Sequence, residues 1–165
     1  MSVENEAIEM SKKPEIIMLI DADSCPVKSE IYRVMNRYQL KTFMVSNCFL
    51  FLPDDPLLER VVVSKDPNCA DDWIVDHVHE ASVVVTSDIP LAARAVQAGG
   101  KCLSPAGRIF DVHSIGHALA IRNLMEDLRE QGSMMGGPRP FCSKDRSAFL
   151  SALDVTIQRL KRCGY

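Results

Sequence analysis

Five consecutive apolar residues, Ile16 to Ile20, constrain the fold more than any other stretch, because two carboxylates follow them at once. A short apolar run without polar alternation is typical of a strand that is buried on both faces of a parallel sheet. Pro26 then favours the first position of a helix, where its missing N–H would have no partner anyway. The sequence therefore predicts that Asp21 and Asp23 lie at the carboxyl end of a buried strand, where open α/β sheets bind their ligands.

Asp21 and Asp23 are separated by a single residue, so their charges repel. Two unit charges 4 Å apart at an effective dielectric constant of 20 repel by about 4 kcal/mol. A proton, a basic side chain or a cation has to offset this repulsion. The alternative is that one acid caps the following helix and the other faces solvent.

The remaining strands and helices alternate along the chain. This alternation predicts a three-layer α/β/α fold with a mainly parallel central sheet and C-terminal helices. The expected strands cover residues 16–20, 41–46, 60–64, 81–86 and 101–103, and the expected helices begin near residues 26, 70, 90, 114 and 143. The segment 48–52 is compatible with an edge strand or with a loop packed on the sheet.

Length and composition indicate one ordinary globular domain. The chain has 165 residues, of which 47% are hydrophobic and 25% charged. Residues 1–15 lack periodicity and are expected to be a disordered extension, which leaves 16–165 as a single domain. No apolar stretch has the length of a membrane span and no signal peptide is visible, so we expect a cytoplasmic location without a membrane partner.

Charge and cysteine spacing exclude several classes of protein. The formal net charge of −3 excludes a globally basic nucleic-acid binder, so a polyanion would have to meet a local basic patch. No two of the six cysteines form a C-x-x-C pair, which excludes zinc ribbons and thioredoxin-like redox sites.

Further acids occupy matching positions along the chain. Asp88 follows the valine-rich strand 81–86, and Asp71 and Asp72 open the helix before that strand. If the first strand and the valine-rich strand are neighbours, these acids converge with Asp21 and Asp23. Oxygen ligands without His or Cys select Mg²⁺ or Mn²⁺. Taken singly, each of these acids could instead cap a helix or complement its dipole.

Several motifs resemble the YaiI/YqxD-like family of small bacterial proteins, in order over about residues 16–155. They are Asp-Ala-Asp-Ser-Cys-Pro-Val-Lys at 21–28, Val-Ser-Asn at 45–47, Ala-Asp-Asp-Trp-Ile at 70–74, Val-Thr-Ser-Asp-Ile-Pro-Leu-Ala at 85–92 and Gly-Gly-Pro-Arg-Pro-Phe-x-x-Lys-Asp-Arg-Ser-Ala-Phe at 136–149. The fold of that family is grouped with the PIN-like nucleases. The resemblance therefore implies a PIN-like α/β/α core and metal-dependent hydrolysis of RNA or DNA.

The resemblance also assigns roles to the acids. Asp21 takes the place of the first-strand acid, Asp71 or Asp72 that of the helix acid, and Asp88 that of the later-strand acid, with Asp23 as their neighbour. Asp21, Asp23 and Asp88 are the expected catalytic residues, and all five acids are candidate ligands of Mg²⁺ or Mn²⁺. PIN nucleases often carry a further acid after the next strand, and here the segment 104–107 carries none.

A basic segment is the candidate for binding substrate. Glycines, Arg139, Lys144 and Arg146 surround the start of the last helix, a combination that suits phosphate groups. Together with Asn47, which follows the second strand, they are the expected substrate-binding residues. The alternative is a plain connecting loop followed by a solvated first turn.

Three functions are compatible with these residues. The first is a Mg²⁺- or Mn²⁺-dependent nuclease that acts on RNA more than DNA. The second is a haloacid-dehalogenase-type phosphatase with Asp21 as nucleophile, Asp23 as acid/base and Thr86 in support, although its usual motif order differs. The third is a non-catalytic RNA- or ribosome-binding module. A homodimer is left open by the sequence.

Overall fold

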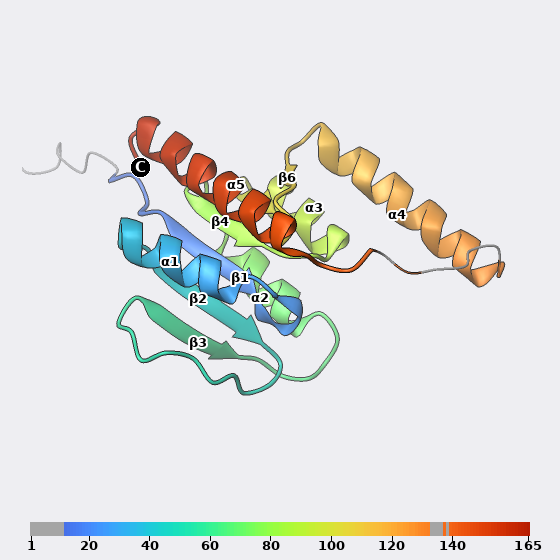
Figure 1. Cartoon of the computed structure of the whole chain (residues 1–165), viewed down its shortest axis with the longest axis horizontal. Coiled ribbons are helices and arrows are strands. Elements are labelled where there is room, and N and C mark those ends of the chain that lie inside the picture. The colour runs from blue at the N-terminus through green and yellow to red at the C-terminus, as the bar shows by residue number, and fades with distance from the viewer. Residues whose placement is uncertain (1–11, 133–136, 138) are drawn as a thin grey trace, which may run out of the picture.

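A computed structural model describes residues 12–132, 137 and 139–165 of the chain, and its centre is one six-stranded sheet (Figure 1). The strand order is β3-β2-β1-β4-β5-β6, parallel throughout except for the antiparallel pair β5–β6. The strands are β1 (Ile17–Asp21), β2 (Lys41–Ser46), β3 (Leu58–Val62), β4 (Ser82–Val85), β5 (Lys101–Leu103) and β6 (Ile109–Phe110).

Helices cover both faces of this sheet and form the outer layers. They are α1 (Lys28–Tyr38), α2 (Cys69–His77), α3 (Ile89–Gln97), α4 (Ser114–Glu130) and α5 (Ser143–Arg162), with a short 3₁₀ turn, η1 (Ala22–Ser24), after β1. The predicted three-layer α/β/α fold with C-terminal helices is thereby confirmed.

Side-chain alternation along β1 explains why two cores form. Met18 and Ile20 face α1 and α5, whereas Leu19 faces α2, α3 and the start of α4. All three side chains are fully buried, as expected for an inner strand of a parallel sheet. The central position of β1 therefore follows from the unbroken apolar run in the sequence.

The start of α1 differs from the prediction. The helix begins at Lys28 and not at Pro26, because η1 follows β1 directly and Pro26 lies in the turn after it. This 3₁₀ turn keeps Asp23 close to the end of β1. The predicted first helical position of Pro26 is therefore wrong by two residues.

Other element boundaries also differ from the sequence-based expectation. The segment 48–52 is a loop, β3 begins two residues before the predicted 60–64 strand, and β6 was not predicted because it has only two residues. The last helix has Cys142, not Ser143, at its N-cap, and the Cys142 N–H donates to Asp145 Oδ2 at 2.9 Å.

Helix α4 packs on α3 through its first turns only. Ile115 and Ala118 are its buried residues, and beyond them the helix extends away from the sheet (Figure 1). In the described residues no helix combines the length and the apolar character that crossing a membrane requires.

Residues 1–11 of the expected N-terminal extension lie outside the described residues. Within the rest of that segment, the Lys13 ammonium donates to the Cys163 carbonyl at 2.6 Å and lies 4.9 Å from the centre of the Tyr165 ring.

Candidate functional site

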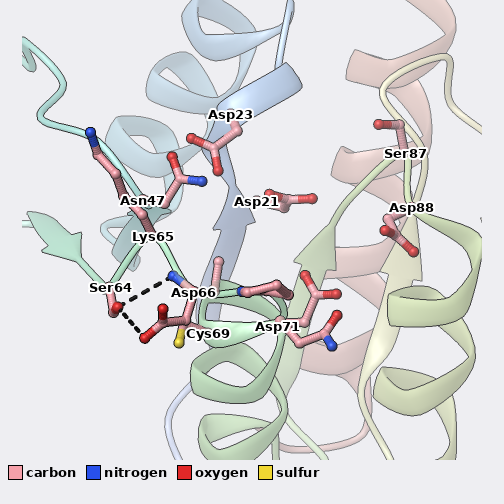
Figure 2. A pocket seen from close by; sticks show the side chains of 13 residues that line it. Asp21, Asp23, Asn47, Ser64, Lys65, Asp66, Cys69, Asp71, Ser87 and Asp88 are labelled. Atoms are coloured by element: carbon pink, nitrogen blue, oxygen red, sulfur yellow. Dashed lines mark hydrogen bonds between the residues drawn. The ribbon is translucent and has the colours of Figure 1, made fainter.

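A pocket of about 390 Å³ opens at the carboxyl ends of β1 and β4. These two strands are neighbours, and the chain proceeds from β1 to β2 on one side and from β4 to β5 on the other. Such a switch point leaves a crevice where α/β sheets bind ligands. The lining consists of Asp21, Asp23 and Asn47, the segment 64–71, and Ser87 with Asp88 (Figure 2).

Asp21 ends β1 and occupies the centre of this group, with Asp23, Asp71 and Asp88 around it (Figure 2). Thr86 Oγ1 donates a hydrogen bond of 2.8 Å to Asp21 Oδ2. Burial raises the pKa of Asp21 above its usual range; the Thr86 hydrogen bond opposes this rise, and the charges of Asp23 and Asp88 add to it. The sequence analysis expected these acids to converge if the first strand and the valine-rich strand are neighbours. They are, because β1 pairs with β4.

Asp88 has two roles in this geometry. Its Oδ1 accepts from the Leu91 N–H at 3.0 Å and so caps α3, which is the alternative that the sequence left open. Its own N–H donates to Thr86 Oγ1 at 3.0 Å. Because the cap uses Oδ1, Oδ2 accepts no hydrogen bond from the part of the chain that is described and is available to the pocket.

Asp23 lies on η1 and is held by the end of β2. Ser46 Oγ donates to Asp23 Oδ1, and Cys48 Sγ lies 3.9 Å from the same oxygen. The end of β2 thus orients the second acid of the D-x-D motif, which explains why Asn47, the next residue after Ser46, also lines the pocket.

The structure distinguishes between the two neighbouring acids of α2. Asp71 lines the pocket, whereas Asp72 turns outward and receives a hydrogen bond of 2.8 Å from Arg94 Nη2. Burial, followed by the charges of Asp88 and Asp21, raises the pKa of Asp71 to about 6. Asp71 is therefore the helix acid of this group, and Asp72 is a surface residue in an ion pair.

Carboxylate oxygens are suitable ligands for a hard cation, but these carboxylates do not form a complete coordination site. Among the described residues, no three His, Cys, Asp or Glu side chains stand close enough together to hold an ion as they are arranged. Mg²⁺ usually uses one or two carboxylates and completes its shell with water and phosphate oxygens. The charges of Asp23 and Asp88 help to raise the pKa of Asp21, and those of Asp88 and Asp21 help to raise the pKa of Asp71, so positive charge would be stabilised here.

The predicted basic residues lie elsewhere. Arg139 donates two hydrogen bonds to Asp145, at 2.6 and 3.0 Å, and Arg146 donates to the Pro26 carbonyl at 2.6 Å. Lys144 is exposed in the first turn of α5. None of the three lines the pocket. Gly136 and Pro138 of the predicted phosphate-binding segment lie outside the described residues.

Several polar residues of the pocket were missed by the sequence analysis, among them Ser64 and Ser87. Lys65, Asp66 and Asn68 belong to the loop between β3 and α2, and Lys65 extends from the rim on the Asn47 side (Figure 2). Asn68 has a φ of +67°, which Asn tolerates better than most residues. The sequence did contain a signal for these loop residues. They follow the third predicted strand, and the carboxyl ends of parallel strands lie at the same edge of the sheet.

Comparison with known proteins identifies the relatives of this chain. The sequence pattern of the YaiI/YqxD family (DUF188, "Uncharacterized BCR") matches residues 19–159. A UPF0178 protein of Bartonella henselae is 75% identical over 148 residues, which are 90% of this chain and 100% of that protein. UPF0178 proteins of Azorhizobium caulinodans and Brucella ovis are 54% and 52% identical, over 94% of this chain and 99% and 98% of their own lengths. No solved structure matches significantly. The chain therefore belongs to the YaiI/YqxD family.

Proposed function

We propose that this chain is a metal-dependent hydrolase that cleaves phosphodiester bonds in nucleic acid, RNA more than DNA. The observation that carries the proposal is the convergence of Asp21, Asp23, Asp71 and Asp88 on one pocket at the switch point of the sheet. These acids come from three different parts of the chain: the end of β1 with η1, the first turn of α2, and the segment after β4. If each acid only capped a helix, there would be no reason for all of them to line the same pocket.

Asp21, Asp23 and Asp88 are the residues that would hold Mg²⁺ or Mn²⁺. Such an ion would activate a water molecule and stabilise negative charge on the phosphate. Thr86 fixes the orientation of Asp21, because it donates to one of its oxygens while accepting from the Asp88 N–H. The hydrogen bond from Ser46 does the same for Asp23.

Asp71 is the carboxylate that can accept a proton from the attacking water. A general base works best when its pKa lies near the pH of the reaction, and in the metal-free pocket burial and the charges of Asp88 and Asp21 raise the pKa of Asp71 to about 6. Lys65 and Asn47 lie at the rim and offer N–H donors to phosphate oxygens. The choice of nucleic acid as substrate rests on the resemblance to the YaiI/YqxD family, whose fold is grouped with the PIN-like nucleases. Comparing RNA with DNA in the cleavage assay tests the preference for RNA.

The test is cleavage of fluorescently labelled RNA and DNA oligonucleotides by the purified full-length chain. We expect cleavage with Mg²⁺ or Mn²⁺ and none with EDTA. Asp21→Asn and Asp71→Asn should lose at least about 100-fold in rate, in line with the loss of a group that acts on the transition state. Asp72→Asn is the matched control, because it removes the adjacent charge outside the pocket.

Two results would contradict the proposal. One is cleavage that survives Asp21→Asn and Asp71→Asn, which would assign the activity to another site or a contaminant. The other is the absence of metal-dependent cleavage of any oligonucleotide by the intact chain. RNA binding that persists without cleavage would support a non-catalytic binding module instead.

A phosphatase with Asp21 as nucleophile is the second candidate. The hydrogen bond between Thr86 and Asp21 favours it, since Thr86 is the supporting residue that this alternative requires. The two candidates differ in the covalent intermediate. A phosphatase predicts turnover of p-nitrophenyl phosphate and an acyl-phosphate on Asp21, detectable as an added phosphoryl mass on the peptide that contains Asp21, whereas the nuclease predicts neither.

A further inference from the structure

The loop after β2 carries two exposed aromatic side chains, Phe49 and Phe51, two and four residues after the pocket residue Asn47. Side chains alternate along it: Leu50 and Leu52 pack against the core beneath α1 and α5, whereas Phe49 and Phe51 point outward. Phe49 is 60% exposed and Phe51 is 94% exposed, the largest fraction among the large apolar side chains that the structure describes. The loop is therefore anchored by its leucines, and its phenylalanines face solvent.

The two rings contact each other edge to face. Their centres are 5.4 Å apart and their planes meet at 84°, so the two rings are not stacked in parallel. The Arg60 guanidinium lies 4.2 Å from the centre of the Phe49 ring. Arg60 Nε also donates to the Leu50 carbonyl at 2.7 Å, which ties the loop to β3. Preorganisation of this kind lowers the entropy cost of binding a ligand.

We propose that Phe49, Phe51 and Arg60 form a stacking site for unpaired nucleobases, outside the acid pocket. Aromatic rings and guanidinium planes are the groups on which proteins stack bases of single-stranded nucleic acid. An exposed aromatic pair without charge would suit many partners, but the cation of Arg60 beside Phe49 favours an anionic ligand with flat bases. This inference rests on the proposed function in taking nucleic acid as the ligand.

The position of the loop connects this site to the pocket. Asn47 lines the pocket, and Phe51 follows it by four residues, a separation of at most about 14 Å for an extended chain. Lys65 lies at the rim on the Asn47 side (Figure 2) and has no carboxylate partner among the described residues. Asp54 and Asp55 lie further along the loop and would repel a phosphate backbone, so the strand would leave the stacking site toward Lys65.

The test measures binding separately from cleavage. Fluorescence anisotropy in EDTA is recorded with a fluorescein-labelled 12-nucleotide RNA, as a single strand and as a duplex. Phe51→Ala should weaken single-strand binding about 5-fold or more, and the double variant with Phe49→Ala about 30-fold or more if each ring stacks one base. Phe51→Trp should retain binding. Because phenylalanine carries no charge, the salt dependence should stay the same.

Leu124→Ala is the matched control, since Leu124 is a 55% exposed apolar residue on α4, away from this loop. The proposal is overturned if the wild-type chain does not bind the single strand, or if the double variant binds it as tightly. Equal weakening of single-strand and duplex binding also overturns it. So does a change in oligomeric state of the double variant by size-exclusion chromatography, because the rings would then belong to a protein contact.

The stacking site and the hydrolase can fail independently. Phenylalanine-dependent binding without any metal-dependent cleavage would support the stacking site and contradict the proposed function. Metal-dependent cleavage with an unchanged KM in the double variant would support the proposed function and contradict the stacking site. If both hold, the double variant should raise KM and leave kcat at saturating RNA near the wild-type value.

Discussion

Replacing Asp71 with Asn should stabilise the metal-free protein at pH 8, although Asp71 belongs to the candidate site. The pKa of Asp71 is raised from 3.8 to about 6, first by burial and then by Asp88 and Asp21. A shift of about 2 units corresponds to about 3 kcal/mol without screening. Because the pocket is open to solvent, we expect screening to reduce this to about 1–1.5 kcal/mol. For a chain of this size the melting temperature should rise by about 2–6 °C.

The pH dependence follows from the direction of the shift. An acid with a raised pKa in the folded state holds its proton more tightly when folded than when unfolded. Below the unfolded pKa of 3.8 Asp71 is protonated in both states, so its charge costs nothing. Between that pH and about 6 the unfolded chain ionises first, and the wild-type protein loses stability. The advantage of Asp71→Asn should therefore be small at pH 4 and complete at pH 8.

The assay is thermal or urea unfolding followed by circular dichroism, in EDTA, at both pH values. Asp72→Asn is the control, because it removes the exposed ion pair with Arg94 and only the smallest of the causes that raise the pKa of Asp71. It should lower the free energy of unfolding by about 0.2–1 kcal/mol at pH 8. A destabilised Asp71→Asn protein at pH 8 would refute the reasoning. An equal gain at pH 4 and pH 8 would also refute it, since the gain would then not come from charge.

Three further predictions concern the site and the core. Millimolar Mg²⁺ or Mn²⁺ should raise the melting temperature of the wild-type protein in differential scanning fluorimetry. The rise should correspond to about 2.7 kcal/mol when the ion is present at 100 times its Kd. Asp21→Asn should show no such rise, and an equal rise in this variant would place the ion elsewhere. Gly107→Ala should cost more than about 2 kcal/mol, because φ is +89° and a Cβ would lie 2.6 Å from the Ala148 backbone carbon. Gly99→Ala is the control, because φ is +93° but no atom lies within 4 Å, so it should cost only the backbone strain of about 1–2 kcal/mol. If both variants lose the same free energy of unfolding in urea, the contact between Gly107 and α5 is not tight. Phe149→Ala should lower the free energy of unfolding by about 3–5 kcal/mol in the same assay, because the Phe149 side chain is fully buried between α5 and the sheet. A loss below about 1 kcal/mol would show that α5 is loosely packed.

Local signals in the sequence were sufficient for the architecture. The strands 41–46 and 101–103 were predicted with their observed bounds, and the apolar run before Asp21 predicted the central strand. These signals work because strand burial and helix periodicity depend on neighbouring residues. The two-residue strand β6 and the η1 turn are too short to leave such a pattern.

The candidate site needed information that no local pattern contains. That Asp21 and Asp88 share a pocket depends on the pairing of β1 with β4, two segments more than sixty residues apart. That Asp71 and not Asp72 faces this pocket depends on the rotation of α2 about its axis, which the burial of Ile74 against the sheet sets. Successive helical residues point about 100° apart, so the sequence could name both acids but could not choose between them.

The sequence by itself determined the order of strands and helices and the kinds of side chain at each strand end, because those depend on residues close together in the chain. Only the tertiary structure decided which of these ends meet. It also moved Arg139 and Arg146 out of the pocket, since Asp145 and the Pro26 carbonyl hold them, and brought Lys65 to its rim. Arg139 and Asp145 are only six residues apart, but Arg146 and Pro26 are 120 residues apart, and packing across the whole molecule brings such distant partners together.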